Sequence, residues 1–200
     1  MIKPQTIEWI AGPVGSLETI VIPPAGEMVG IAVLIHPNPT QGGTNTNKVV
    51  QMMAKVVSKR GYVAYLPNCR GVGQSEGEYD WGNGETDDAL AVIQYAKGQH
   101  GDLPLLLGGF SFGTLVVSQV RQRVEAEKLI LAGPACKRFP VAAVPKDTLV
   151  IHGEEDEVIP LADVLDWARP QALPIVVVPG CSHFFHGKLT QLADVIERHW

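Results

Sequence analysis

Hydrophobic residues gather along this chain in short runs that are separated by amphipathic segments. Two β-prone segments lie within residues 6–22 and are separated by the turn sequence GPVGS, which predicts an antiparallel hairpin. The later apolar runs are nearly continuous and rich in Val, Ile and Leu, as in parallel strands that are covered on both faces. These later runs occupy residues 30–36, 61–67, 103–110, 128–133, 148–153 and 173–180.

Segments with a helical spacing of apolar positions lie between these runs. They cover residues 45–60, 84–98, 112–124, 160–169 and 186–199. The alternation of strand and helix implies right-handed crossovers and a mostly parallel, twisted sheet with helices on both faces, which is an α/β fold. No repeat, low-complexity tract or charged linker divides residues 1–200, so we predict a single domain. In such sheets, ligands bind where the strands reach their carboxyl ends.

Composition and charge narrow the range of partners. The formal net charge is -5 and no run of Lys and Arg occurs, which argues against nucleic acid or an anionic membrane as a partner. The stretch MIKPQTIEWIAGPVG lacks the apolar core of a secretory signal, and no segment approaches the roughly 18 apolar residues that span a bilayer. The three cysteines are far apart and form no CxxC pair. We therefore expect a soluble, cytoplasmic protein with free thiols.

Other signals of cofactors or assembly do not occur. The chain contains neither HExxH nor a cysteine and histidine cluster, so we expect no metal. It has no GxGxxG after a strand and no GxxxxGK, so we expect no nucleotide cofactor. No heptad pattern indicates a coiled-coil interface, and the sequence leaves the oligomeric state open.

The pattern GxSxG occurs twice, as GQSEG at residues 73–77 and as GFSFG at residues 109–113. A nucleophilic serine of this pattern sits at a tight turn between a strand and a helix, where only small neighbours fit. Ser111 meets this requirement, because LPLLLGGF precedes it and TLVVSQVRQRV follows it. Ser75 is followed by a loop with no helical segment until about residue 84. We therefore predict Ser111 as the nucleophile and Ser75 as part of a glycine-rich turn.

A serine nucleophile needs a base to take its proton and an acid to orient that base. When the nucleophile lies in a strand–GxSxG–helix turn, the acid and then the histidine follow the serine along the chain. Four consecutive carboxylates, Glu154 to Glu157, follow the strand expected at 148–153. His183 lies three residues after Gly180, which ends the last expected strand. His183 is the better placed base, and His186 remains its rival.

Three loops together resemble the signature loops of the α/β-hydrolases: GFSFG, HGEEDEVIP and PGCSHFF, each after an expected strand. The likeness runs over most of the chain and is strongest to small bacterial serine hydrolases without a lid, which are similar to dienelactone hydrolases and short-chain esterases. It implies Asp156 as the acid and His183 as the base. NCRGVGQSEG resembles a loop of this family that carries no triad residue, which supports the structural interpretation of Ser75.

The same resemblance bears on the oxyanion hole, with one departure. Many family members have a glycine after the first strand's histidine, whereas this chain has His36-Pro37-Asn38-Pro39, and proline has no N–H to donate. The resemblance implies the N–H of Asn38 as the second donor beside that of Phe112. Gly42 and Gly43 stay open as alternatives. Dienelactone hydrolases carry cysteine where Ser111 lies, so their specific activity is not implied.

Together these features predict a serine hydrolase that cleaves small carboxylic esters or thioesters through an acyl-enzyme on Ser111. About fourteen residues separate the strands expected at 128–133 and 148–153, where related enzymes insert a cap domain, so we expect an open site. Phe110 and Phe184 are candidate substrate-binding residues. The alternatives are acyl transfer, amidase or peptidase activity on the same triad, or a non-catalytic binding protein of this fold.

Overall fold

The computed structural model describes residues 5–200. The stretch MIKPQTIEWIAGPVG, in which we expect no secretory signal, therefore begins with four residues that lie outside the described residues. Its centre is one eight-stranded sheet in the order β1-β2-β4-β3-β5-β6-β7-β8. The strands are β1 (Thr6–Ala11), β2 (Ser16–Ile22), β3 (Gly30–Ile35), β4 (Tyr62–Pro67), β5 (Leu105–Phe110), β6 (Lys128–Ala132), β7 (Leu149–Gly153) and β8 (Val176–Val178).

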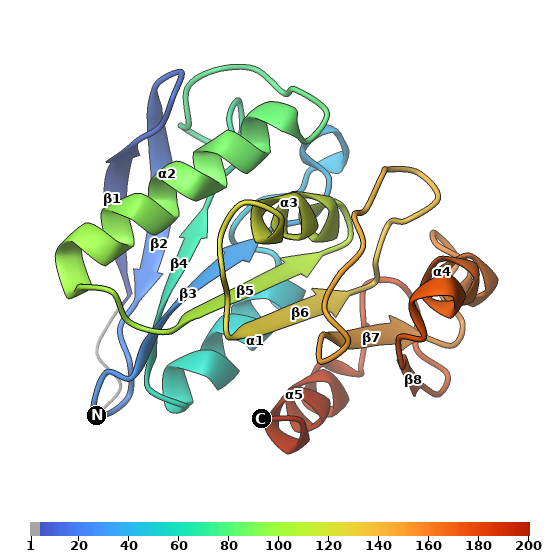
Figure 1. Cartoon of the computed structure of the whole chain (residues 1–200). Coiled ribbons are helices and arrows are strands. Elements are labelled where there is room, and N and C mark those ends of the chain that lie inside the picture. The colour runs from blue at the N-terminus through green and yellow to red at the C-terminus, as the bar shows by residue number, and fades with distance from the viewer. Residues whose placement is uncertain (1–4) are drawn as a thin grey trace.

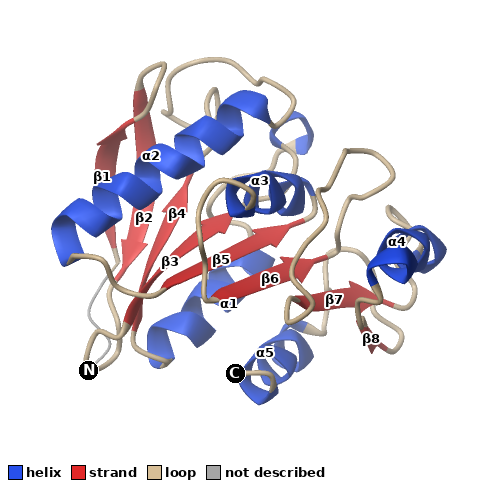
Figure 2. Cartoon of the chain, in the orientation of Figure 1, coloured by secondary structure: helices blue, strands red, loops and turns tan. Residues whose placement is uncertain are grey.

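Strand direction follows the expected pattern. β1 and β2 form the predicted antiparallel hairpin, and β2 also pairs antiparallel with β4. All pairs from β4 through β3 to β8 are parallel. Figure 2 shows β3, β5, β6 and β7 pointing the same way, so their carboxyl ends meet at one edge of the sheet. This arrangement confirms the predicted mostly parallel α/β sheet with an N-terminal antiparallel hairpin.

Helices cover both faces of the sheet (Figure 1). α1 (Lys48–Lys59) and α5 (Leu189–Arg198) pack on one face, and α2 (Asn83–His100) and α3 (Phe112–Arg121) pack on the other. α4 (Leu161–Ala168) adds Val164 and Ala168 to the second of these cores. Every residue of β3, β4 and β5 is buried, because these central strands have helices on both sides. Burial on both faces explains why their sequences are almost uniformly apolar.

The C-terminal elements are shorter than their apolar patterns suggest. Residues 173–180 predict a strand, but only Val176–Val178 pair in the sheet, because the N–H of Leu173 donates to the carbonyl of Ala168 at 3.2 Å. The last helix begins at Leu189 rather than near residue 186. Phe185 and Gly187 have φ of 54° and 68°, and a left-handed backbone cannot continue into a right-handed helix. Two short 3₁₀-helices occupy Pro39–Gln41 and Arg169–Gln171.

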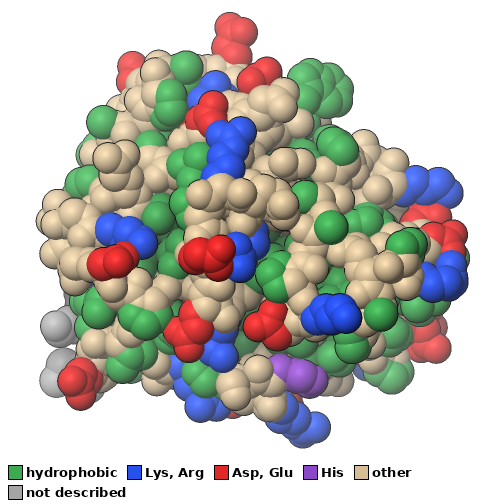
Figure 3. Space-filling model, in the orientation of Figure 1, with side chains coloured by type: hydrophobic (Ala, Val, Ile, Leu, Met, Phe, Trp, Pro, Cys, Tyr) green, Lys and Arg blue, Asp and Glu red, His purple; other side chains and the backbone are tan. Residues whose placement is uncertain are grey.

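The surface carries charges of both signs. Acidic and basic side chains are interspersed on the face seen in Figure 3, without a broad patch of one sign. Within residues 5–200, no helix combines the length and apolar character needed to cross a membrane.

Candidate active site

Ser111 lies at a sharp turn between β5 and α3, with φ of 54° and ψ of -117°. Two neighbouring glycines make this turn possible. A Cβ on Gly109 would lie 2.3 Å from the carbonyl oxygen of Gly113, and a Cβ on Gly113 would lie 2.2 Å from that of Ile35. The close approach of backbone segments therefore requires both glycines of the GxSxG pattern. The backbone of Ser111 is strained, and its side chain projects at the edge where the parallel strands end.

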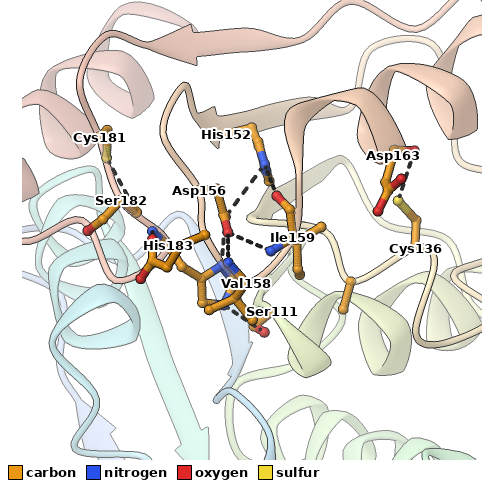
Figure 4. Close-up of polar contacts among 12 residues, drawn as sticks. Ser111, Cys136, His152, Asp156, Val158, Ile159, Asp163, Cys181, Ser182 and His183 are labelled. Atoms are coloured by element: carbon orange, nitrogen blue, oxygen red, sulfur yellow. Dashed lines mark hydrogen bonds and ion pairs between the residues drawn. The ribbon is translucent and has the colours of Figure 1, made fainter.

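Ser111, His183 and Asp156 form one hydrogen-bonded chain (Figure 4). The Ser111 hydroxyl lies 3.0 Å from Nε2 of His183, and Nδ1 of His183 lies 2.7 Å from Oδ2 of Asp156. All three residues are buried, and the serine keeps 8% of its surface exposed. The structure thus brings together the three residues predicted to act as nucleophile, base and acid, which come from loops after β5, β7 and β8.

The carboxylate of Asp156 accepts three hydrogen bonds, of which one comes from His183. Its Oδ1 accepts the N–H groups of Val158 at 2.9 Å and Ile159 at 2.7 Å. Burial raises the pKa of Asp156, but hydrogen bonds from His183 and Ile159 outweigh that effect and hold the pKa below its ordinary value. Asp156 is therefore ionised at neutral pH and can orient and stabilise a charged imidazole on its other oxygen.

His152 is a residue of this site that the sequence did not reveal, because chain order excluded it as the base. Its fully buried Nε2 lies 2.9 Å from the carbonyl oxygen of Ile159 and 3.5 Å from Oδ2 of Asp156 (Figure 4). A carbonyl only accepts hydrogen bonds, so Nε2 carries the proton. Burial lowers the pKa of His152, against the charge of Asp156, and keeps the ring neutral. His152 thus ties the acid loop to β7.

The other acidic residues of the loop have separate partners. Glu154 accepts the N–H of Gly180 at 2.9 Å, and Glu157 accepts the N–H of His183 at 3.1 Å. Both therefore hold the histidine loop in place through its backbone. His186 is exposed and stacks on Phe184 with ring centroids 5.9 Å apart. His183, and not His186, contacts Ser111.

The loop after β3 supplies the second predicted oxyanion donor. The N–H of Gly42 donates to the carbonyl of Pro39 at 3.2 Å, and that of Gly43 donates to the carbonyl of Asn38 at 3.0 Å. Both glycine N–H groups are thus engaged inside the loop, whereas the N–H of Asn38 has no acceptor among residues 5–200. The N–H of Phe112, at the first position of α3, has no partner within its helix. These contacts favour Asn38 over the two glycines.

His36 holds the same loop through two hydrogen bonds of its imidazole ring. Its Nδ1 lies 2.7 Å from the carbonyl oxygen of Pro37, and its Nε2 accepts the N–H of Cys69 at 2.9 Å. The ring is fully buried, and burial lowers the pKa of His36 to about 4. A neutral imidazole with its proton on Nδ1 therefore joins the loop after β3 to the loop after β4.

The space beside the serine is a pocket with a cavity volume of about 280 Å³. Polar and charged side chains line much of it, including Asn38, Arg138 and Glu157. Phe184 lines the pocket and is 42% exposed, and its role in substrate binding stays a prediction. Phe110 does not line it and is fully buried, so the prediction that it binds substrate is wrong. Its fully buried ring lies 5.1 Å from that of His183.

The cysteine thiols and the possibility of a metal site were the remaining candidates for reactive groups. Burial raises the pKa of Cys181 to about 11 and that of Cys136 to about 11, which keeps both thiols protonated at neutral pH. Within residues 5–200, no group of three or more His, Cys, Asp or Glu side chains is arranged to hold a metal ion. A reaction without a cofactor stays a prediction.

Comparisons with known proteins agree with this geometry. A family model described as serine aminopeptidase, S33, matches residues 33–146. The crystal structure of XC6422 from Xanthomonas campestris, described as an α/β serine hydrolase without lid, is 34% identical with a TM-score of 0.93, covering 100% of this chain and 95% of that one. An α/β serine hydrolase homologue from Coxiella burnetii is 34% identical with a TM-score of 0.88, covering 99% and 97%. RP471 of Rickettsia prowazekii, an uncharacterized protein, is 28% identical over 94% of this chain and 85% of its own length.

Proposed function

Because this chain belongs to the serine aminopeptidase S33 family of α/β serine hydrolases, we propose that it hydrolyses carboxylic esters with small acyl groups through an acyl-enzyme on Ser111. Membership confirms the resemblance and the α/β-hydrolase fold that three loops of the sequence indicated. The substrate class and the roles of individual residues are the proposal.

The observation that carries the proposal is the chain of contacts from Ser111 through His183 to Asp156, with distances of 3.0 Å and 2.7 Å. His183 takes the hydroxyl proton as the Ser111 oxygen attacks the carbonyl carbon. The N–H groups of Phe112 and Asn38 hold the resulting oxyanion. Asp156 keeps the proton of the resting imidazole on Nδ1 and stabilises its charged form.

The second half of the reaction uses the same groups. The tetrahedral intermediate collapses, the bond from carbon to the leaving oxygen breaks, and His183 gives its proton to that oxygen. Water then attacks the acyl carbon and loses a proton to His183. The bond from that carbon to the Ser111 oxygen breaks, and His183 returns the proton to the serine as the acid leaves. A pocket of about 280 Å³ beside the serine supports a small acyl group, since it lies at the lower end of ligand-site volumes.

Aminopeptidase activity is a second candidate. The description of the matching family names it, and the carboxylate of Glu157 lies in the pocket, where it would pair with a free amino terminus. Alanine p-nitroanilide tests this candidate directly. Turnover of the anilide that exceeds turnover of p-nitrophenyl acetate would replace the esterase proposal.

A fluorophosphonate reagent tests the proposed nucleophile. We expect one adduct, on Ser111, and we expect labelling to disappear in His183→Ala while the protein stays folded by circular dichroism. An unlabelled but well-folded wild-type protein would indicate a binding protein of this fold. An adduct on Ser75 would overturn the site itself.

A series of p-nitrophenyl esters tests the proposed acyl preference. We expect kcat/KM to be highest for acetate to butyrate and to fall by about tenfold or more at decanoate, because the acyl group must fit beside the serine. A preference for long acyl chains would contradict the proposal. Acyl transfer to an added alcohol is measured in the same assay from the ester that accumulates.

A further inference from the structure

A groove on the surface leads away from the candidate active site. The catalytic pocket and a neighbouring hollow of about 230 Å³ share Asn47 and Phe184. That hollow and a larger groove of about 440 Å³ share Lys48 and Leu189. Since each hollow shares wall residues with the next, the three lie side by side from the pocket at Ser111 to the surface of α1.

The larger groove has an apolar floor and a cationic rim. Ile22, Met52 and Leu189, all half-buried, contribute to its floor. Lys48, Lys55 and Lys59 line it as well, and their spacing along α1 places them on one side of that helix. With a rise of about 1.5 Å per residue, Lys48 and Lys59 are about 16 Å apart along the helix axis. The groove is therefore long, apolar and positively charged at its edge.

The lysines have few protein partners. Lys59 pairs with Glu197 at 3.9 Å, in a contact exposed to solvent on both sides. Such a surface pair contributes little. Among residues 5–200, the ammonium groups of Lys48 and Lys55 make no hydrogen bond and no ion pair, although their backbones lie within α1. Long lysine stems often cover apolar surface with no further purpose, but here the covered surface lies next to a hollow that adjoins the pocket at Ser111.

Chemistry decides which part of an ester lies on this side. In the collapse of the tetrahedral intermediate, the proton on Nε2 of His183 moves to the leaving oxygen, so that oxygen must contact His183. Phe184 follows His183 in the chain and lines both the pocket at Ser111 and the neighbouring hollow of about 230 Å³, which adjoins the groove. With Phe184 next to His183, we place the leaving group on the side of the groove and the acyl group beside Ser111.

We propose that the groove binds the leaving alcohol of the substrate, and that this alcohol is an amphiphile with an apolar chain and a distal anionic group. The chain lies over Met52 and Leu189, and the anion pairs with Lys55 and its neighbours. This inference rests on the proposed ester hydrolysis and adds the class of alcohol to it. The substrate is then a short-chain acyl ester of an anionic, extended alcohol.

Binding of the product alcohol tests the groove without any turnover. The probe is 10-hydroxydecyl phosphate, titrated by isothermal calorimetry into the wild-type protein and its variants. We expect Lys55→Glu and Met52→Gln each to weaken binding at least fivefold. Met28→Gln and Lys146→Glu are the matched controls, because Met28 is equally half-buried but lines a different hollow and Lys146 is an exposed lysine outside the groove. Both controls should bind like the wild type.

Two related ligands define the expected chemistry. Decane-1,10-diol lacks the anion and 2-hydroxyethyl phosphate lacks the chain, so each should bind at least tenfold more weakly than the probe. Equal binding of the probe to all four variants would overturn the inference. Binding of phosphatidylglycerol vesicles that is lost in the groove variants, without binding of the monomeric probe, would overturn it in favour of a membrane surface.

Turnover separates this inference from the proposed function. The acetate ester of 10-hydroxydecyl phosphate should have a kcat/KM at least tenfold above that of the acetate ester of 2-hydroxyethyl phosphate, and Met52→Gln should reduce that ratio. If both esters are hydrolysed equally well, the groove inference fails and the proposed function stands. If the probe binds as expected but no ester is hydrolysed, the proposed function fails instead.

Discussion

The loops GFSFG and GQSEG share a pattern and use it in opposite ways. In GFSFG the serine itself takes the left-handed backbone, with φ of 54° at Ser111, and the glycines make room for neighbouring chain segments. In GQSEG the glycines take the left-handed backbone, with φ of 57° at Gly73 and 89° at Gly77, and Ser75 keeps an ordinary negative φ. Of these two loops, GFSFG is the one that holds a non-glycine residue in this strained backbone conformation.

The two hydroxyls differ just as clearly. The Ser75 hydroxyl accepts the N–H of Glu18 at 2.9 Å and donates to the carbonyl of Asn68 at 2.8 Å. It is therefore saturated by backbone groups, as expected of a structural serine. The Ser111 hydroxyl contacts the imidazole of His183 at the edge of a pocket. A hydroxyl that meets a base is available for chemistry, while one that meets two backbone groups holds a loop.

The structural loop still supports the reactive region. Asn68, which accepts from Ser75, also accepts the N–H of Asn45 at 2.9 Å. Its neighbour Cys69 donates to His36, which in turn holds Pro37 beside the predicted oxyanion donor Asn38. The GQSEG loop therefore positions the loop after β3 through two bridges.

Exchanging each serine for alanine should separate the two loops most strongly. Ser111→Ala removes the nucleophile, and we expect kcat for p-nitrophenyl acetate to fall by about 10³-fold or more with little change in stability. Ser75→Ala leaves two backbone groups without a partner, and we expect it to lower the free energy of unfolding by about 1–3 kcal/mol. Steady-state kinetics and urea denaturation measure the two effects.

The comparison would be wrong if Ser75→Ala abolished turnover in a protein that remains folded at the assay temperature. It would also be wrong if Ser111→Ala kept more than about a tenth of the wild-type kcat, a loss of less than about 1.4 kcal/mol in transition-state stabilisation.

Alanine at the last glycine of each loop sharpens the contrast. In Gly113→Ala the new Cβ meets the backbone oxygen of Ile35 at 2.2 Å, so β3 and α3 must separate, and we expect a loss of about 4 kcal/mol or more in unfolding free energy. In Gly77→Ala the Cβ meets the side chain of Val14, which can move, and the left-handed φ costs about 1–3 kcal/mol.

Thermal denaturation ranks these two variants. A Gly113→Ala protein that is as stable as Gly77→Ala would show that close approach of β3 and α3 is not what the reactive loop requires of glycine.

The bridge between the loops should make stability depend on pH. Burial lowers the pKa of His36 from 6.5 to about 4 in the folded state, so between these values the unfolded chain binds a proton that the folded chain does not. Stability from this residue is complete above pH 6.5 and falls as the pH decreases, by on the order of 3 kcal/mol near pH 4.

His36→Gln removes the titrating group, and we expect its unfolding free energy to vary less between pH 6.5 and 4 than that of the wild type, as measured by urea denaturation at each pH. A pH dependence equal to that of the wild type would mean that His36 does not link the loops as a buried neutral ring.

Much of this architecture could be predicted from the chain alone. The uniformly apolar runs of β3, β4 and β5 indicated buried parallel strands, because helices on both faces leave no polar side for them to present. Among four consecutive carboxylates, only the resemblance to a family loop singled out Asp156. The position of Ser111 between a strand and a helix, and that of His183 after the last expected strand, could be read from the chain itself. These signals are local or depend on chain order, so a sequence carries them in full.

What the sequence could not show depends on neighbours distant along the chain. Phe110 reads as an aromatic next to the nucleophile, yet its side chain points into the core behind His183. His152 reads as a strand residue, yet packing sets its ring 3.5 Å from Asp156. The groove along α1 arises only where residues of α1 meet Ile22 of β2 and Leu189 of α5, which are distant in the sequence.

The sequence by itself therefore determined the sheet, the reactive turn and the order of its partners, because periodicity and backbone sterics act over a few residues. Only the tertiary structure decided which histidines stay neutral, that Phe110 lies in the core, and which side chains line the pocket beside Ser111. Those properties depend on burial and on distances between segments that the chain separates by as many as 72 residues, as between Ser111 and His183.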